Sequence, residues 1–147
     1  MGKNKRGLAG RMTEGTAKAV FTIGYGGRRF ADFIRLLQQH DIALVVDVRR
    51  FPGSKVSEYR RGNLEAELSR LGIEYVWMGD MLGGLRREGY VQYMQSSDYQ
   101  EGIERLAKLA RQKNLAILCK ERTDAGCHRR HIVASLVQKG VNVIALV

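Results

Sequence analysis

The chain has 147 residues, 25 Lys and Arg against 15 Asp and Glu, and a formal net charge of +10. A length of roughly 150 residues is typical of one domain with its own core, and 44% hydrophobic residues argue against general disorder. No apolar run approaches the roughly 18 residues of a membrane span, and the two cysteines make no disulfide framework. We therefore expect a basic, cytoplasmic domain with no membrane partner.

The first segment of the chain is basic and has no hydrophobic period. Residues 1–18 hold five Lys or Arg and one Glu, a charge of +4, and lack the apolar stretch of a secretory signal. We predict a basic N-terminal arm over residues 1–19 and an α/β domain over residues 20–147.

Strand-like and helix-like segments alternate along that domain. Short apolar runs predict buried strands at 20–23, 44–47, 73–77, 115–118 and 141–146. Helical spacing of apolar residues predicts four helices between them, the first from Phe30 to Leu37. The second is expected to start at Asn63 and end at Gly72, the third to start at Ser97, and the last to start near Thr123 or Gly126 and end at Gly140. This alternation predicts a single three-layer α/β domain, with about five mostly parallel strands and helices on both faces.

Residues that could bind a ligand or take part in catalysis follow the carboxyl ends of the predicted strands. This is the edge where open α/β sheets bind ligands. In chain order they are Gly24, Tyr25 and Gly26, then Asp47 and Arg49, then Gly83 and Gly84, and finally Cys119, Glu121, Cys127, His128 and Arg129. The connections 48–62 and 78–96 at this edge are long, whereas those at the opposite edge are short. Long loops on one edge predict a site there.

Basic residues gather in the same loops. They account for 11 of the 25 basic side chains: Arg49, Arg50, Lys55, Arg60, Arg61, Arg86, Arg87, Lys120, Arg122, Arg129 and Arg130. The fork of an arginine suits phosphate, and glycines let backbone N–H groups approach an anion closely. An anionic ligand is therefore predicted at this edge.

Several of these motifs occur together in one known family. They are Thr22-Ile23-Gly24-Tyr25, Asp47-Val48-Arg49, Leu82-Gly83-Gly84, Tyr93-Met94, and a Cys-x-Glu motif at Cys119 and Glu121 followed by Cys127-His128-Arg129. On these motifs the chain from Phe21 to Leu146 resembles the DUF488 family of uncharacterised proteins. The resemblance implies an α/β fold and no settled activity. Tyr25 stands where many relatives carry histidine, and Thr123-Asp124 stands where the family often has Asp-Pro.

Cys127 is the candidate nucleophile. We expect it in the first turn of the last helix, where a helix N-terminus and nearby arginines stabilise a thiolate. His128 does not share a helix face with Cys127, whereas His131, four residues further on, does. The alternative is a small cysteine packed under the sheet, with Arg129 in a salt bridge.

Asp47 and Arg49 lie two residues apart at the end of a strand and therefore point to the same side. They predict a pair in which Arg49 holds an anion. Asp47 would orient the Arg49 side chain toward that anion or act as a base. The alternative is a structural ion pair. Glu121 is the second candidate proton carrier.

No metal and no cofactor are predicted. A zinc site of Cys119, Cys127, His128 and Glu121 would lack the usual close ligand pairs. Gly24-x-Gly26 resembles the start of a dinucleotide motif, but Arg29 occupies the place of its third glycine.

Two functions follow as hypotheses. The first is an enzyme-like domain that binds an anionic, phosphate-bearing small molecule at the carboxyl edge. In it Cys127, Asp47 and Glu121 carry the chemistry, and the ligand is held by Gly24, Tyr25, Gly26, Arg49, Gly83, Gly84, His128 and Arg129. The second is a non-catalytic nucleic-acid-binding module that uses the basic arm and the same rim, since tyrosines alternate there with basic loops.

Overall fold

The computed structural model describes residues 19–122 and 128–146. One sheet contains five strands in the order β3-β2-β4-β1-β5. Their bounds are Val20–Gly24 for β1, Leu44–Asp47 for β2, Glu74–Trp77 for β3, Leu115–Cys119 for β4 and Val143–Leu146 for β5. Every pairing is parallel. The predicted α/β architecture is confirmed, and β4 lies at the centre of the sheet.

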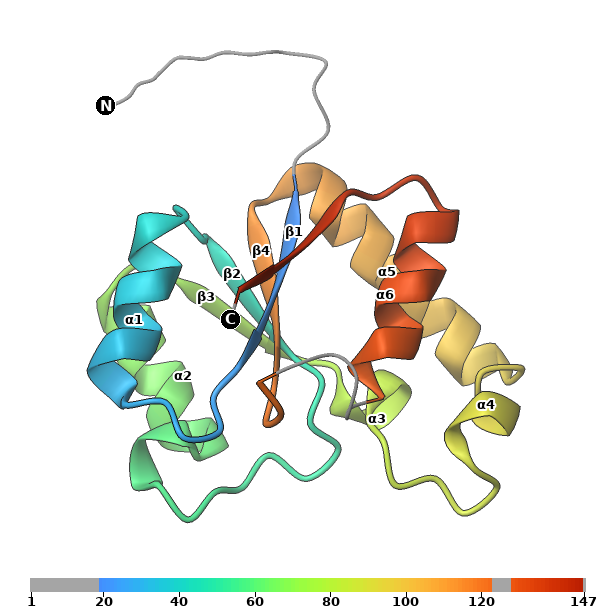
Figure 1. The fold of residues 1–147 in the computed structure, drawn as a ribbon, viewed down its shortest axis with the longest axis horizontal. Coiled ribbons are helices and arrows are strands. Elements are labelled where there is room, and N and C mark those ends of the chain that lie inside the picture. The colour runs from blue at the N-terminus through green and yellow to red at the C-terminus, as the bar shows by residue number, and fades with distance from the viewer. Residues whose placement is uncertain (1–18, 123–127, 147) are drawn as a thin grey trace.

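Helices cover both faces of the sheet (Figure 1). Helices α1 (Phe30–Gln39) and α2 (Arg61–Arg70) pack on one face, and α5 (Ser97–Gln112) and α6 (Arg129–Gln138) pack on the other. Leu115 and Ile117 of β4 belong to the core under α5 and α6, whereas Ala116 and Leu118 belong to the core under α1 and α2. Because both faces are covered, the strand is an unbroken apolar run rather than an alternating one.

The two long connections at the carboxyl edge hold short helices of their own. A 3₁₀ turn, η1 (Ser57–Tyr59), lies in the first connection, and α3 (Gly79–Leu82) and α4 (Tyr90–Tyr93) lie in the second. These loops are therefore folded segments that hold fixed positions around the end of the sheet.

Two predicted helix starts are wrong. Ser96, not Ser97, is the N-cap of α5, because its extended backbone lets its Oγ accept a hydrogen bond from the Tyr99 N–H at 3.1 Å. Asn63 lies inside α2, where its Nδ2 donates to the Ser57 carbonyl at 2.9 Å and joins the helix to η1.

The predicted helix ends at two glycines are confirmed. Gly72 has a φ of +78° and Gly140 a φ of +83°, the left-handed conformation in which glycine commonly ends a helix. The last helix starts at Arg129 with His128 as its N-cap. The predicted start near Thr123 or Gly126 falls in residues 123–127, outside the described residues. Among the described helices, none is long and apolar enough to cross a membrane.

The connections that follow the central strand β4 and its two neighbours lead to opposite faces of the sheet. The loop after β4 leads to α6 on one face, while the flanking strands β1 and β2 lead to α1 and α2 on the other (Figure 1). Ligands of open α/β sheets bind where neighbouring strands send their connections to opposite faces. The topology therefore favours a site at the carboxyl end of β4.

Candidate functional site

A cleft of about 1080 Å³ opens at this place. It is lined by the segment after β1, the long connection after β2, part of the loop after α3, the end of β4, and His128. Of the predicted site residues, those that line it are Tyr25, Gly26, Arg49, Gly84, Glu121 and His128. The structure thus brings together residues from four separate connections.

Most of the charged side chains that line the cleft are basic. Among the described residues of the lining, six are cationic, namely Arg28, Arg29, Arg49, Arg50, Lys55 and Lys120, and two are acidic, namely Glu58 and Glu121. A concave surface with this surplus of positive charge concentrates anions.

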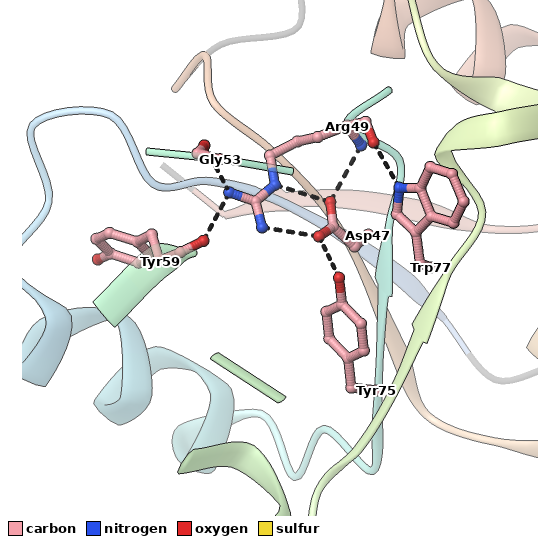
Figure 2. A network of polar contacts seen from close by, with 6 residues as sticks. All are labelled: Asp47, Arg49, Gly53, Tyr59, Tyr75 and Trp77. Atoms are coloured by element: carbon pink, nitrogen blue, oxygen red, sulfur yellow. Dashed lines mark hydrogen bonds and ion pairs between the residues drawn. The ribbon is translucent and has the colours of Figure 1, made fainter. Parts of the chain in front are cut away.

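Arg49 forms a bidentate ion pair with Asp47 (Figure 2). The guanidinium donates from Nε to Oδ1 at 2.9 Å and from Nη2 to Oδ2 at 2.7 Å. The backbone N–H of Arg49 also donates to Oδ1, and the Tyr75 hydroxyl donates to Oδ2 at 2.5 Å. Asp47 is 0% exposed and Arg49 is 6% exposed. Each carboxylate oxygen therefore accepts two hydrogen bonds inside the protein.

The same arginine ties the long connection after β2 to the sheet. Its Nη1 donates to the Tyr59 carbonyl at 2.8 Å and to the Gly53 carbonyl at 3.4 Å, and its own carbonyl accepts from Trp77 Nε1 at 2.7 Å. Burial lowers the pKa of Arg49, but the hydrogen bonds and charge of Asp47 outweigh burial and raise it overall. This geometry favours the structural alternative for the pair; a catalytic role for Asp47 stays a prediction.

Arg28 is a cation in the cleft that the sequence reasoning missed. Its Nε donates to the Gly24 carbonyl at 3.0 Å. Its Nη2 is buried and makes no hydrogen bond with any described residue. Burial, and after it the positive charge of Arg122, lower the pKa of Arg28, although a guanidinium stays protonated in proteins. The signal was available, because Arg28 directly follows Gly26 and Gly27 after a strand.

Gly24 at the end of β1 and Gly26 after it allow close backbone packing. A Cβ on Gly24 would lie 1.7 Å from the Glu121 carbonyl oxygen. The N–H groups of Tyr25 and Gly26 donate to the carbonyls of Cys119 and Lys120 at 3.1 and 2.7 Å. These contacts extend the pairing of β1 with β4, so these two N–H groups are used within the protein. Tyr25 itself stacks on Tyr59, with ring centroids 4.4 Å apart.

The glycines after α3 have different surroundings. Gly83 is buried, and its N–H donates to the Gly79 carbonyl at 2.9 Å. A Cβ on Gly83 would lie 2.5 Å from the Cβ of Arg50. Gly84 lines the cleft, and a Cβ there would lie 3.0 Å from Nδ1 of His128.

The described residues of the cysteine motif lie in different surroundings. Cys119 ends β4 with its side chain buried, and its Sγ contacts the Glu121 carbonyl at 3.8 Å. Glu121 is exposed in the cleft. Arg129 is buried in the first turn of α6 and is not among the described residues that line the cleft. Cys127 lies outside the described residues.

His128, the N-cap of α6, and His131 of α6 both pack against Tyr90 of α4. The ring centroid of Tyr90 lies 5.2 Å from that of His128 and 5.5 Å from that of His131. Burial, followed by the charge of Arg130, lowers the pKa of His131. Within residues 19–122 and 128–146, no three His, Cys, Asp or Glu side chains gather closely enough to hold a metal ion.

The comparisons with known proteins give one match. No curated protein and no solved structure matches the chain. A family model described as a domain of unknown function, DUF488, matches residues 29–136. The matched range runs from the start of α1 to the last turns of α6, and so holds the first long connection, the second one and most of the cleft. The chain therefore belongs to the DUF488 family.

Proposed function

We propose that the cleft at the carboxyl edge binds a small anionic, phosphate-bearing molecule. The observation that carries this proposal is the surplus of cationic side chains around one concave surface, where the part of the chain that the structure describes supplies six basic and two acidic side chains. Of the six, Arg49 is paired with Asp47, so the remaining five exceed the acids by three. A bound phosphate would neutralise charges that otherwise repel one another.

Arg28 and Lys120 are the side chains that hold the anion in this proposal. Both line the cleft beside the ends of β1 and β4, and a Cβ on Gly26 would lie 3.8 Å from the Lys120 side chain. Arg28 carries a buried Nη2 that makes no hydrogen bond with the described residues. Arg49 contributes positive potential and the shape of the wall, because four of its five N–H groups are used by Asp47, Gly53 and Tyr59.

The test is a titration of the protein with inorganic phosphate at constant ionic strength. Binding is measured from NMR chemical shifts. We expect shifts at Tyr25, Gly26 and Lys120, and at least fivefold weaker binding for Lys120→Met and for Arg28→Met. Lys108→Met is the matched control, since Lys108 is exposed on α5, away from the cleft. Equal affinities in all three variants would refute the proposal.

The proposal extends to chemistry at Cys127, with Glu121 as the proton carrier. Glu121 supports this role because it is exposed in the cleft, whereas the oxygens of Asp47 are occupied. Alkylation by iodoacetamide tests it, with Cys119→Ala and Cys127→Ala as the paired variants. We expect Cys127 to react near neutral pH and Cys119, 1% exposed, to stay protected. An inert Cys127 would remove the catalytic part and leave anion binding intact.

A nucleic-acid-binding module is the second candidate. Cationic and aromatic side chains meet at several places on this edge: Arg61 lies 4.7 Å from the ring centroid of Trp77, and Arg50 lies 5.4 Å from that of Phe51. Such pairs occur on surfaces that bind single strands. This candidate predicts binding to an oligonucleotide that falls steeply with salt and weakens when residues 1–18 are deleted. Undetectable or salt-independent binding would dismiss it.

A further inference from the structure

The mouth of the cleft is apolar, although its cationic side chains suit an anion. Three side chains that line it are strongly exposed: Phe51 at 66%, Val56 at 47% and Leu85 at 79%. A single exposed apolar side chain is ordinary, whereas several of them gathered on one surface are typical of a site that binds a ligand or partner. Their presence around one opening indicates that part of the bound ligand is apolar.

Leu85 also has an unfavourable backbone conformation. Its φ is +60°, in the left-handed region that a branched side chain adopts only with strain. Glycine would fit this turn without strain. The side chain is not buried, so no core packing in the described structure compensates for the strain. Strain held at a cleft in this way is typical of a functional position.

Arg50 holds the two sides of the mouth in place. Its Nη1 donates to the Leu85 carbonyl at 2.6 Å, and its guanidinium carbon lies 5.4 Å from the centroid of the Phe51 ring. Phe51 belongs to the connection after β2, and Leu85 to the loop after α3. Arg50 thereby links two separate loops and keeps both apolar side chains at the same opening.

The size of the cleft favours the same conclusion. Its volume of about 1080 Å³ lies slightly above the usual range for sites that bind organic ligands, roughly 300–1000 Å³. An inorganic anion fills only a small part of such a space, since one water molecule takes about 30 Å³. The remaining room is bordered by Phe30, Tyr59 and Tyr90 as well as by the three exposed side chains.

We propose that the ligand is an organic phosphate, whose phosphate lies against Arg28 and Lys120 and whose apolar or aromatic body contacts Phe51 and Leu85. This inference rests on the proposed function and adds the chemical class of the ligand. The phosphate provides attraction to the cleft, and the apolar body provides the discrimination against inorganic anions. Leu85 is a specificity-determining residue in this account, retained for ligand contact in spite of its strained backbone.

The experiment compares inorganic phosphate with 1-naphthyl phosphate by calorimetry, on the full-length protein at one ionic strength. Burying an aromatic body against two apolar side chains predicts at least about tenfold tighter binding of the naphthyl ester. Phe51→Ser and Leu85→Gly should each reduce that ratio at least threefold and leave the affinity for inorganic phosphate unchanged. Val137→Ser, at a position 55% exposed on α6, is the matched control.

Leu85→Gly has a second readout. Because glycine relieves the strain at φ +60°, this variant should unfold at a higher temperature than the wild type while losing the preference for the ester. Equal affinity for the two phosphates, or an unchanged ratio in both variants, would overturn the inference and leave the anion site standing. Binding of neither phosphate would overturn the anion site and the inference together.

Discussion

The pair of Asp47 and Arg49 gives the sharpest quantitative prediction. Asp47→Asn keeps the shape of the side chain and removes its charge, which leaves the Arg49 guanidinium buried opposite a neutral amide. Arg49 is 6% exposed and its partner 0% exposed, so solvent cannot replace the lost charge. Removing one partner of a buried ion pair costs about 3–5 kcal/mol. That is a large share of the 5–15 kcal/mol by which a domain is typically stable.

Asp32→Asn is the matched control. Asp32 and Arg35 also form an ion pair with an N–O distance of 2.7 Å, but its side chains are 46% and 63% exposed. Exposed pairs contribute about 0.2–1 kcal/mol. The two substitutions are chemically identical and the ion-pair distances are equal, so the difference between them measures the effect of burial.

A suitable assay is unfolding in urea, measured by the fluorescence of Trp77, the one tryptophan of the chain. Trp77 reports on this site because its Nε1 donates a hydrogen bond to the Arg49 carbonyl. The double variant Asp47→Asn with Arg49→Met should recover part of the loss, since the unpaired buried charge is then gone. The reasoning is refuted if Asp47→Asn costs no more than Asp32→Asn. It is also refuted if the two substitutions at the buried pair are additive.

Three further predictions concern the backbone, a helix cap and pH. Gly24→Ala should destabilise the protein by about 3 kcal/mol, because its Cβ would lie 1.7 Å from the Glu121 carbonyl oxygen. Gly27→Ala meets nothing within 4 Å and should cost only about 1–2 kcal/mol for its φ of +67°; similar losses at both glycines, measured in urea, would contradict this. Ser96→Ala should cost about 1 kcal/mol and Ser97→Ala less than about 0.5 kcal/mol, and thermal unfolding that shows the reverse order would assign the cap to Ser97. Burial raises the pKa of Tyr59 to about 12 from an ordinary value of 10.0. The contribution of this group to the free energy of unfolding is therefore fully present below pH 10 and is lost as the pH rises from 10 to 12, because the unfolded chain loses its proton first. Unfolding free energies across this range should therefore fall less steeply in Tyr59→Phe, and an equal fall in both proteins would show that Tyr59 does not contribute.

The sequence predicted the fold in most of its parts because the physical signals were local. Continuous apolar runs mark strands buried on both faces, and Gly72 and Gly140 mark helix ends by a conformation that glycine favours. The predicted helix start at Ser97 is wrong because the neighbouring Ser96 is the cap. The predicted start at Asn63 is wrong because α2 begins at Arg61 with no side-chain cap. Propensity does not distinguish Ser96 from Ser97, since the choice depends on which of them the preceding turn leaves extended.

The cleft lies at the edge of the sheet that the sequence indicated, and the sequence predicted only some of the residues that line it. Strand ends and loop lengths located the edge, because parallel strands bring their carboxyl ends together. The sequence also placed Asp47 beside Arg49 correctly, since residues two apart on a strand share a face. It could not show that Tyr75 and Trp77, from the next strand, complete the hydrogen bonding of that pair. Those partners are nearly 30 residues away, and only the register of β2 with β3 brings them there.

The contrast between Arg49 and Arg28 shows why position alone does not identify an anion-binding residue. Both follow a strand at the same edge and both line the cleft. Arg49 has an acidic neighbour two residues earlier, and the strand geometry directs that carboxylate at it, so its donors are used inside the protein. The strand before Arg28 ends in glycine. Burial lowers the pKa of Arg28 most; among the charged side chains that act on it, Arg122 has the largest effect and also lowers this pKa, while Asp32 raises it more weakly. Among the described residues, no carboxylate accepts a hydrogen bond from Arg28, whose Nε donates to the Gly24 carbonyl and whose Nη2 has no partner there. For this reason the proposed anion site uses Arg28 and not Arg49.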